Sequence, residues 1–143
     1  MRVIFLSFEG VLHPAGAASP VRGIATNLFC WFDILASLLM QFTDVFLVVH
    51  SSERHRHSPQ ELGSLLGRLG DRYLGVTPPG PSDLAIREWL ARHPSVNSYR
   101  ILDAQPKGFG ERAPLELVVC HPFTGIAAPE IQDQLRRWLR QEW

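Results

Sequence analysis

Short apolar runs alternate along the chain with longer segments in which apolar residues recur at helical spacing. The runs at residues 2–6 (RVIFL) and 45–49 (VFLVV) are typical of strands buried on both faces of a parallel sheet. Shorter runs at residues 72–76, 99–103 and 115–120 predict further strands. Because strands and helices alternate, we expect a three-layer α/β/α fold with a mostly parallel sheet.

The segments between these runs have the pattern of helices. Residues 25–42 predict the first, and Ser58 stands before Pro59 in the order of a capped helix start, with Glu61 at the third helical position. Ser82 or Asp83 is expected to cap the next helix. Its apolar stripe is formed by Leu84, Ile86, Trp89 and Leu90. The apolar stripe of the first helix is formed by Leu28, Trp31, Phe32, Leu35, Leu38 and Leu39.

The last predicted helix, residues 129–141, allows two interpretations. In the first, Leu135, Trp138 and Leu139 face the core and the arginines lie in water. In the second, Trp138 and Trp143 stack on nucleic-acid bases while Arg136, Arg137 and Arg140 contact phosphates. We favour the first.

Length and composition indicate an ordinary globular protein. With 143 residues, 45% hydrophobic and 20% charged, the chain is expected to form a single domain, residues 1–143. The loop at residues 10–23 is too short to fold as a separate cap domain. The formal net charge is zero, so no overall field attracts nucleic acid or an acidic membrane.

Two apolar segments and the two cysteines indicate the cellular compartment of the protein. Residues 1–19 superficially resemble a signal peptide, and residues 24–42 are nearly long enough to span a bilayer, but polar residues interrupt both. Cys30 and Cys120 match no metal or redox spacing and are expected to be reduced, buried thiols. We therefore expect a cytoplasmic protein with no membrane partner.

Polar residues follow several of the predicted strands. Ser7 and Glu9 follow the first strand, residues 50–52 follow the second, and Asp103 ends the run YRILD. Because ligands of parallel sheets bind beyond the carboxyl ends of the strands, these positions are where a functional site is expected. Ser7, His50 and Asp103 nominally supply a nucleophile, a base and an orienting acid.

A second polar cluster, ERHRHS at residues 53–58, also has more than one interpretation. It is most simply a solvated basic loop. Its arginines also suit phosphate oxygens, since guanidinium forks match them. His55 and His57 have the spacing of a metal-site fragment, but no further ligands stand nearby in the sequence.

Five stretches in order resemble the haloacid dehalogenase (HAD) superfamily, and most closely the HAD domain associated with Swiss Army Knife RNA-repair proteins. They are SFEGVLHP (7–14), LVVHSSER (47–54), AIREWLARHP (85–94), YRILDAQ (99–105) and LVVCHPFTGI (117–126). The resemblance covers nearly the whole chain and implies a HAD-like Rossmannoid fold.

The resemblance also implies roles that this chain fills only in part. The family's nucleophilic Asp, which takes the phosphoryl group, corresponds to Ser7, and its general acid and base corresponds to Glu9. The Ser or Thr that holds a phosphoryl oxygen falls on His50 or Ser51, and Arg54 matches a family Arg.

The later motifs depart further from the family. Its lysine, expected near PGPSDLAI, is absent, and Asp83 or a neighbour stands there; the only lysine of the chain is Lys107. In the acidic motif Asp103 is present, but the second acid is Ala104. These losses predict a catalytically degenerate site.

Two functional hypotheses follow. The first is a pseudo-phosphatase that binds a phosphorylated ligand or a protein partner through His50, Ser51, Ser52 and Arg54. The second is a phosphohydrolase of unusual mechanism, in which Glu9 and Asp103 hold a weakly bound Mg²⁺. A third, a pure scaffold, predicts that neither metal nor phosphate raises the melting temperature. Nucleic acid enters as a partner only through the family context.

Overall fold

The computed structural model describes residues 1–16, 29–50, 57–110 and 113–141. Its centre is a five-stranded sheet in the order β3-β2-β1-β4-β5, with every neighbouring pair parallel. The strands are β1 (Arg2–Leu6), β2 (Val45–Val49), β3 (Tyr73–Val76), β4 (Ser98–Asp103) and β5 (Leu117–Val119). The predicted bounds of β1 and β2 are confirmed. Both strands are buried on both faces, which is why their sequences read as apolar runs.

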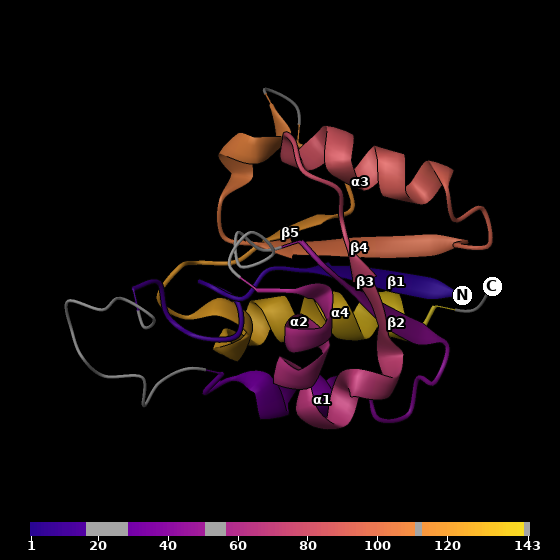
Figure 1. Ribbon diagram of the computed structural model, residues 1–143. Helices are drawn as coiled ribbons and strands as arrows, with labels where there is room; N and C mark the ends of the chain where they lie inside the picture. Colours follow the sequence, from indigo (N-terminus) through magenta and orange to yellow (C-terminus); the bar gives the residue numbers. More distant parts are fainter. Residues whose placement is uncertain (17–28, 51–56, 111–112, 142–143) are drawn as a thin grey trace.

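Helices cover both faces of this sheet, as the sequence predicts (Figure 1). One face carries α1 (Phe32–Leu39), α2 (Pro59–Leu65) and α4 (Pro129–Leu139), and the other carries α3 (Ser82–Ala91). Short 3-10 helices complete the connections: η4 (Gly67–Arg72), η5 (Pro106–Phe109) and η6 (Gly125–Ala127). The three-layer α/β/α arrangement is confirmed.

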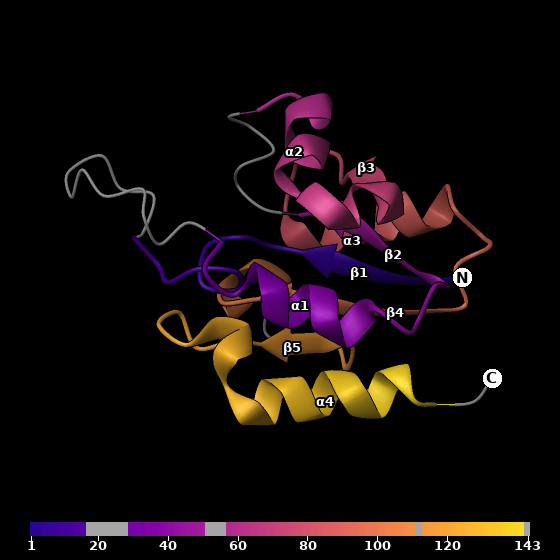
Figure 2. The ribbon, with the colours of Figure 1, turned by 90° about the horizontal axis from the view of Figure 1, so that it is seen from below.

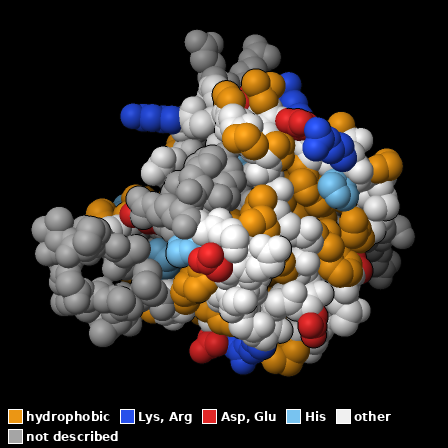
Figure 3. All heavy atoms as spheres, viewed as in Figure 1, with side chains coloured by type: hydrophobic (Ala, Val, Ile, Leu, Met, Phe, Trp, Pro, Cys, Tyr) orange, Lys and Arg blue, Asp and Glu red, His pale blue; other side chains and the backbone are white. Residues whose placement is uncertain are grey.

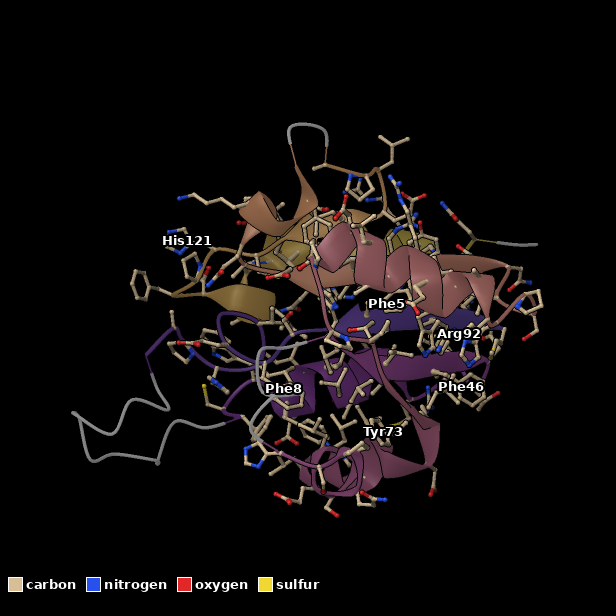
Figure 4. The ribbon with its side chains drawn as sticks, turned by 45° about the horizontal axis from the view of Figure 1, so that its top comes forward. Phe5, Phe8, Phe46, Tyr73, Arg92 and His121 are labelled. Atoms are coloured by element: carbon tan, nitrogen blue, oxygen red, sulfur yellow. The ribbon has the colours of Figure 1, made fainter. Side chains whose placement is uncertain are left out.

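The two faces of the sheet are packed unequally. In the larger core cluster, Ile4, Leu6 and Leu47 of the sheet lie on the face covered by α1, α2 and α4. The smaller one lies under α3, where Figure 4 shows Phe5. There Phe5 meets Trp89 and Tyr99 in edge-to-face contacts with ring centroids 5.4 and 5.7 Å apart. Successive residues of β1 thus point alternately into two different cores.

The predicted cap of α2 is confirmed, whereas the predicted cap and part of the predicted apolar stripe of α3 are wrong. Ser58 caps α2 and accepts a hydrogen bond from the amide of Glu61, as predicted. No side chain caps α3, because Ser82 is its first residue and Pro81 occupies the N-cap position. Leu84 is more than half exposed, so its predicted place in the apolar stripe is wrong; Ala85 is buried instead.

The first and last helices also refine the predictions. α1 begins only at Phe32, with Trp31 before it, while residues 25–28 of the predicted helix lie outside the described residues. In α4, Leu135, Trp138 and Leu139 are buried, which confirms the first interpretation. Trp138 is only 1% exposed, so it offers no surface for base stacking.

Among the described residues, no helix is long and apolar enough to cross a membrane. Part of the loop at residues 10–23 lies outside the described residues. On the face seen in Figure 3, acidic and basic side chains are scattered rather than gathered into one block of a single sign. This agrees with the zero net charge of the chain.

Candidate functional site

The parallel hydrogen-bond ladder continues one residue past the central strands and brings a row of polar residues to one level. The amide of Ser7 donates to the Leu102 carbonyl (3.2 Å), that of His50 to Leu6 (2.8 Å) and that of Thr77 to Val49 (3.1 Å). Asp103 directly follows Leu102 in β4, so it lies level with Ser7, on the side of β1 opposite His50. Across the sheet this strand-end row therefore runs Thr77, His50, Ser7, Asp103.

The alternation of side chains places part of this row on a single face. Phe5, Val48 and Ile101 belong to the core under α3, and Ser7, His50 and Asp103 lie two positions further along the same strands. Since residues two apart on a strand share a face, these three side chains project toward the α3 side. The structure thus gathers three of the predicted site residues.

The hydroxyl of Ser7 is turned toward the main chain. Ser7 is 6% exposed, and its Oγ donates to the carbonyl of His50 at 3.4 Å, near the upper limit of hydrogen-bond length. The imidazole of His50, itself buried, places Nδ1 2.9 Å from Thr77 Oγ1. The geometry therefore lacks the Ser7–imidazole hydrogen bond on which a Ser–His–Asp relay depends.

Glu9 lies outside the buried row. Its side chain is exposed, and Oε1 accepts a hydrogen bond of 2.8 Å from the amide of Gly16. Residues Glu9 and His13 also form an isolated backbone bridge within the same loop. The Glu9 carboxylate therefore stabilises the loop that follows β1, and this contact is a local structural reason for an acid at position 9.

Asp103 also engages its own segment. Its Oδ1 accepts a 2.9 Å hydrogen bond from the amide of Gln105, an arrangement that favours a turn directly after β4. Carboxylate oxygens suit Mg²⁺, so Asp103 and Glu9 have the right donor chemistry for that ion. Within the part of the chain that the structure describes, however, no group of three or more His, Cys, Asp or Glu side chains is placed to hold a metal.

Close packing surrounds the position of the missing second acid. Gly10 has a φ of +77°, and a Cβ added to it would lie 2.6 Å from Cβ of Ala104 and 3.3 Å from Cα of Pro122. A positive φ favours glycine, and so does this close approach. The methyl group of Ala104 thus lies against Gly10, and a side chain at position 10 would collide with it.

The residues after β5 have separate environments. Burial, with the nearby Asp103 charge, raises the pKa of the Cys120 thiol to about 12. His121 is exposed at the outer edge of the molecule (Figure 4), and its Nδ1 accepts from the amide of Phe123. The prediction of a buried thiol is confirmed for Cys120 and wrong for Cys30, which is exposed.

Other predicted residues lie elsewhere or outside the described part of the chain. Ser51, Ser52, Arg54 and His55 belong to residues 51–56, which the structure does not describe. His57 contacts Glu61 at the start of α2, 3.1 Å from Nδ1 to Oε2, and this contact lowers the pKa of Glu61.

The substitutes for the missing lysine also lie apart from the row. Asp83 stands in the first turn of α3 and lines a cavity of about 300 Å³ with Phe109 and Pro114. Lys107, on η5, is exposed. Among the described residues, neither makes a hydrogen bond or an ion pair with the strand-end row.

Thr77 is the residue of the row that sequence reasoning missed. It stands at the start of TPPGPS, a segment that its prolines mark as a linker. Yet it is 2% exposed and holds the His50 ring. The signal was available in its position, since Thr77 follows its strand directly, as Ser7 and His50 follow theirs.

Comparisons with known proteins agree with this geometry. Searches of curated proteins and of solved structures found no match. The model of one family, described as the HAD domain in Swiss Army Knife RNA repair proteins, matches residues 3–131. This range includes all five strands except Arg2, and all of the strand-end row. A match over most of the chain, on a fold with polar residues after parallel strands, shows the family. The chain belongs to the family of HAD domains found in Swiss Army Knife RNA repair proteins.

Proposed function

We propose that this HAD domain has lost aspartate-nucleophile phosphotransfer and uses its strand-end site to bind a phosphorylated ligand. The observation that carries the proposal is the state of Ser7. It occupies the position at which the family resemblance implies the nucleophile, and it is buried with its hydroxyl directed to the His50 carbonyl.

The chemistry of serine supports this. An aspartate nucleophile forms an acyl phosphate that water opens readily, whereas serine would form a phosphate monoester that resists hydrolysis. Serine also adds no negative charge with which to hold Mg²⁺. At position 104 a closely packed methyl group stands in place of the second acid. Ser7 and Ala104 thus each leave out a negative charge that the family resemblance implies at this edge of the sheet.

The proposed binding residues are His50, Ser51, Ser52 and Arg54. The buried His50 brings the chain to the strand-end row, and the segment that follows it carries two hydroxyls and an arginine. Hydroxyls and a guanidinium fork are suitable donors for phosphate oxygens. Because the family description names RNA repair, a phosphorylated RNA end is one ligand with this chemistry.

An assay of Mg²⁺-dependent hydrolysis of an aryl phosphate tests the loss of catalysis. The native protein is compared with Ser7→Asp, which restores the nucleophile, and with Asp103→Asn, which controls for contaminating phosphatases. We expect no turnover by the native protein or by Asp103→Asn. Native activity that disappears in Asp103→Asn would overturn the proposal, and activity in Ser7→Asp alone would show that loss of the nucleophile accounts for the silence.

The alternative function is Mg²⁺-dependent hydrolysis without a protein nucleophile. Asp103 favours it, because this acid is retained level with Ser7 on the neighbouring strand. Here Asp103 and Glu9 would hold the ion, which would stabilise charge on the phosphate, while Glu9 would accept a proton from water. This function predicts slow native turnover that is lost in both Asp103→Asn and Glu9→Gln.

A further inference from the structure

A groove lies between α1 and α4, on the side of these helices that faces away from the sheet. The two helices lie side by side and nearly parallel (Figure 2). The groove has a volume of about 500 Å³. None of the described residues that line it belongs to the strand-end row. It is therefore separate from the site discussed above.

The floor of this groove is apolar and partly open to solvent. It is formed by Ile34, Leu38 and Phe42, which are half-buried against the larger core. These residues are spaced four apart, so they form a ridge that follows α1 and continues beyond its end. At about 1.5 Å per residue the ridge is roughly 12 Å long, which suits two to three turns of another helix.

The α4 side of the groove is positively charged. Arg136 and Arg140 line it one helical turn apart, and Arg137 stands beside them in an adjoining hollow. Among the described residues, Arg136 bonds Asp133 and Gln132 of its own helix, at 3.2 and 3.3 Å. Such exposed pairs are weak and easily exchanged, so these guanidinium groups can turn to carboxylates of a partner.

The acid on the other side of the groove does not cancel this charge. Asp33 lines the α1 side, but Arg68 lies 2.7 Å from it and supplies a further positive charge, so the acid leaves the charges of Arg136 and Arg140 in excess. In a chain whose net charge is zero, the groove thus combines an apolar floor with an arginine-rich rim. An occupant with a complementary surface would have an apolar stripe flanked by carboxylates.

We propose that the groove between α1 and α4 docks an acidic amphipathic helix of a partner protein. Apolar residues of that helix would pack on Ile34, Leu38 and Phe42, and its Asp or Glu side chains would bind Arg136 and Arg140. This is the recognition mode in which an apolar helix face enters a groove. An apolar floor gives no hydrogen bonds to a phosphate backbone, and Trp138 is buried, so nucleic acid fits the groove less well.

Titration of the ¹⁵N-labelled full chain, followed by NMR, tests this proposal. The probe is a synthetic helical peptide with leucines at helical spacing and glutamates along both flanks; its partner peptide carries lysines in place of the glutamates. We expect the acidic peptide to shift resonances of α1 and α4 selectively, with an affinity on the order of 0.1 mM, since the interface is small. The lysine peptide should cause no such shifts.

Charge reversal makes the test specific. The double variant Arg136→Glu with Arg140→Glu should weaken binding of the acidic peptide about tenfold or more and gain binding of the lysine peptide. Arg140→Glu alone, at an exposed position, should move binding in the same direction by less. Arg92→Glu is the matched control, because Arg92 follows α3 beyond the opposite face of the sheet, where it pairs with Glu88.

Three results would overturn the proposal. The first is the absence of shifts at about 1 mM acidic peptide, well above the expected affinity. The second is binding that charge reversal leaves unchanged or that Arg92→Glu weakens equally. The third is a short RNA oligonucleotide that shifts the same residues at lower concentration than the acidic peptide.

Discussion

Polar groups are buried at both ends of the central sheet, but they are satisfied differently. At the end where the strands begin, Arg2 is 4% exposed and its guanidinium makes four hydrogen bonds. Two go to Asp44, and two go to the carbonyls of Trp138 and Leu139. At the end where the strands finish, the Ser7 hydroxyl makes a single hydrogen bond among the described residues, of 3.4 Å, to the carbonyl of His50.

This difference separates a structural buried group from a candidate functional one. A buried charge is tolerated only when it is paired and hydrogen-bonded, and Arg2 meets that condition while it links β1, the residue before β2 and the last turn of α4. The Ser7 hydroxyl makes one long hydrogen bond, to the neighbouring strand end, so it contributes less to the stability of the fold. We infer that stability is concentrated at the first end and ligand binding at the second.

The largest effect is expected from Arg2→Met. The variant keeps much of the apolar stem but removes the partner of Asp44 and the donors to the last carbonyls of α4. We expect the free energy of unfolding to fall by about 3 kcal/mol, measured by urea denaturation. A loss below about 0.5 kcal/mol, the range of ordinary surface changes, would break the comparison.

A smaller loss is expected from Gly10→Ala, at the strand-finish end. The added Cβ would approach Ala104 closely, and φ is +77°, so strain and contact together should cost about 2 kcal/mol. The matched control is Gly16→Ala, because Gly16 has a similar φ of +84° but its added Cβ meets no atom of the described residues within 4 Å. Equal losses in the two variants would show that backbone strain alone, without the contact to Ala104, sets the cost.

The Arg2–Asp44 pair should also give a pH-dependent signature. The hydrogen bond from Arg2 lowers the pKa of Asp44, so the pair stabilises the fold above the unfolded-state pKa, near 4. Asp44→Asn should cost about 1 kcal/mol near neutral pH, because this carboxylate is half exposed.

That cost should vanish as the pH falls through the lowered folded-state pKa of Asp44. The free energies of unfolding of the native protein and Asp44→Asn, measured across the acidic range, provide the check. A difference that persists unchanged at the lowest pH would mean that the pair contributes through geometry rather than charge.

The smallest effect is expected from Ser7→Ala. Since its hydrogen bond is long and made to a carbonyl, the change should cost less than about 1 kcal/mol. Thr77→Val gives a matched comparison in the same row, because Thr77 Oγ1 lies 2.9 Å from the His50 ring. Urea denaturation of both variants should show the larger loss for Thr77→Val, and the reverse order would contradict the account.

The sequence predicted elements where local signals were complete. β1 and β2 were recognised because their apolar runs need no partner to be seen, and α2 because Ser58 and Glu61 stand at cap spacing. In α3, Leu84 was chosen for its hydrophobicity, although Ala85 is the residue one turn before Trp89. Small residues on a buried face leave little trace in a hydrophobic pattern.

The places of the candidate residues at the strand ends could be predicted from the sequence, but their contacts could not. Ser7, His50 and Asp103 follow strands, and the parallel ladder brings them to one level. The contacts of Arg2 were missed because its partners Asp44 and Trp138 are far away in the sequence, and Thr77 was missed because the prolines after it mark a linker. Which main-chain atom the Ser7 hydroxyl meets likewise depends on the fold, not on any local pattern.

The proposed division between a structural end and a binding end is tested most directly by calorimetric titration of the full chain with inorganic phosphate. The account predicts saturable binding at one site per chain, weakened about tenfold or more by Arg54→Gln and retained in Asp44→Asn, which alters only the opposite end of the sheet. Absence of binding at millimolar phosphate, or equal weakening by the two variants, would contradict it.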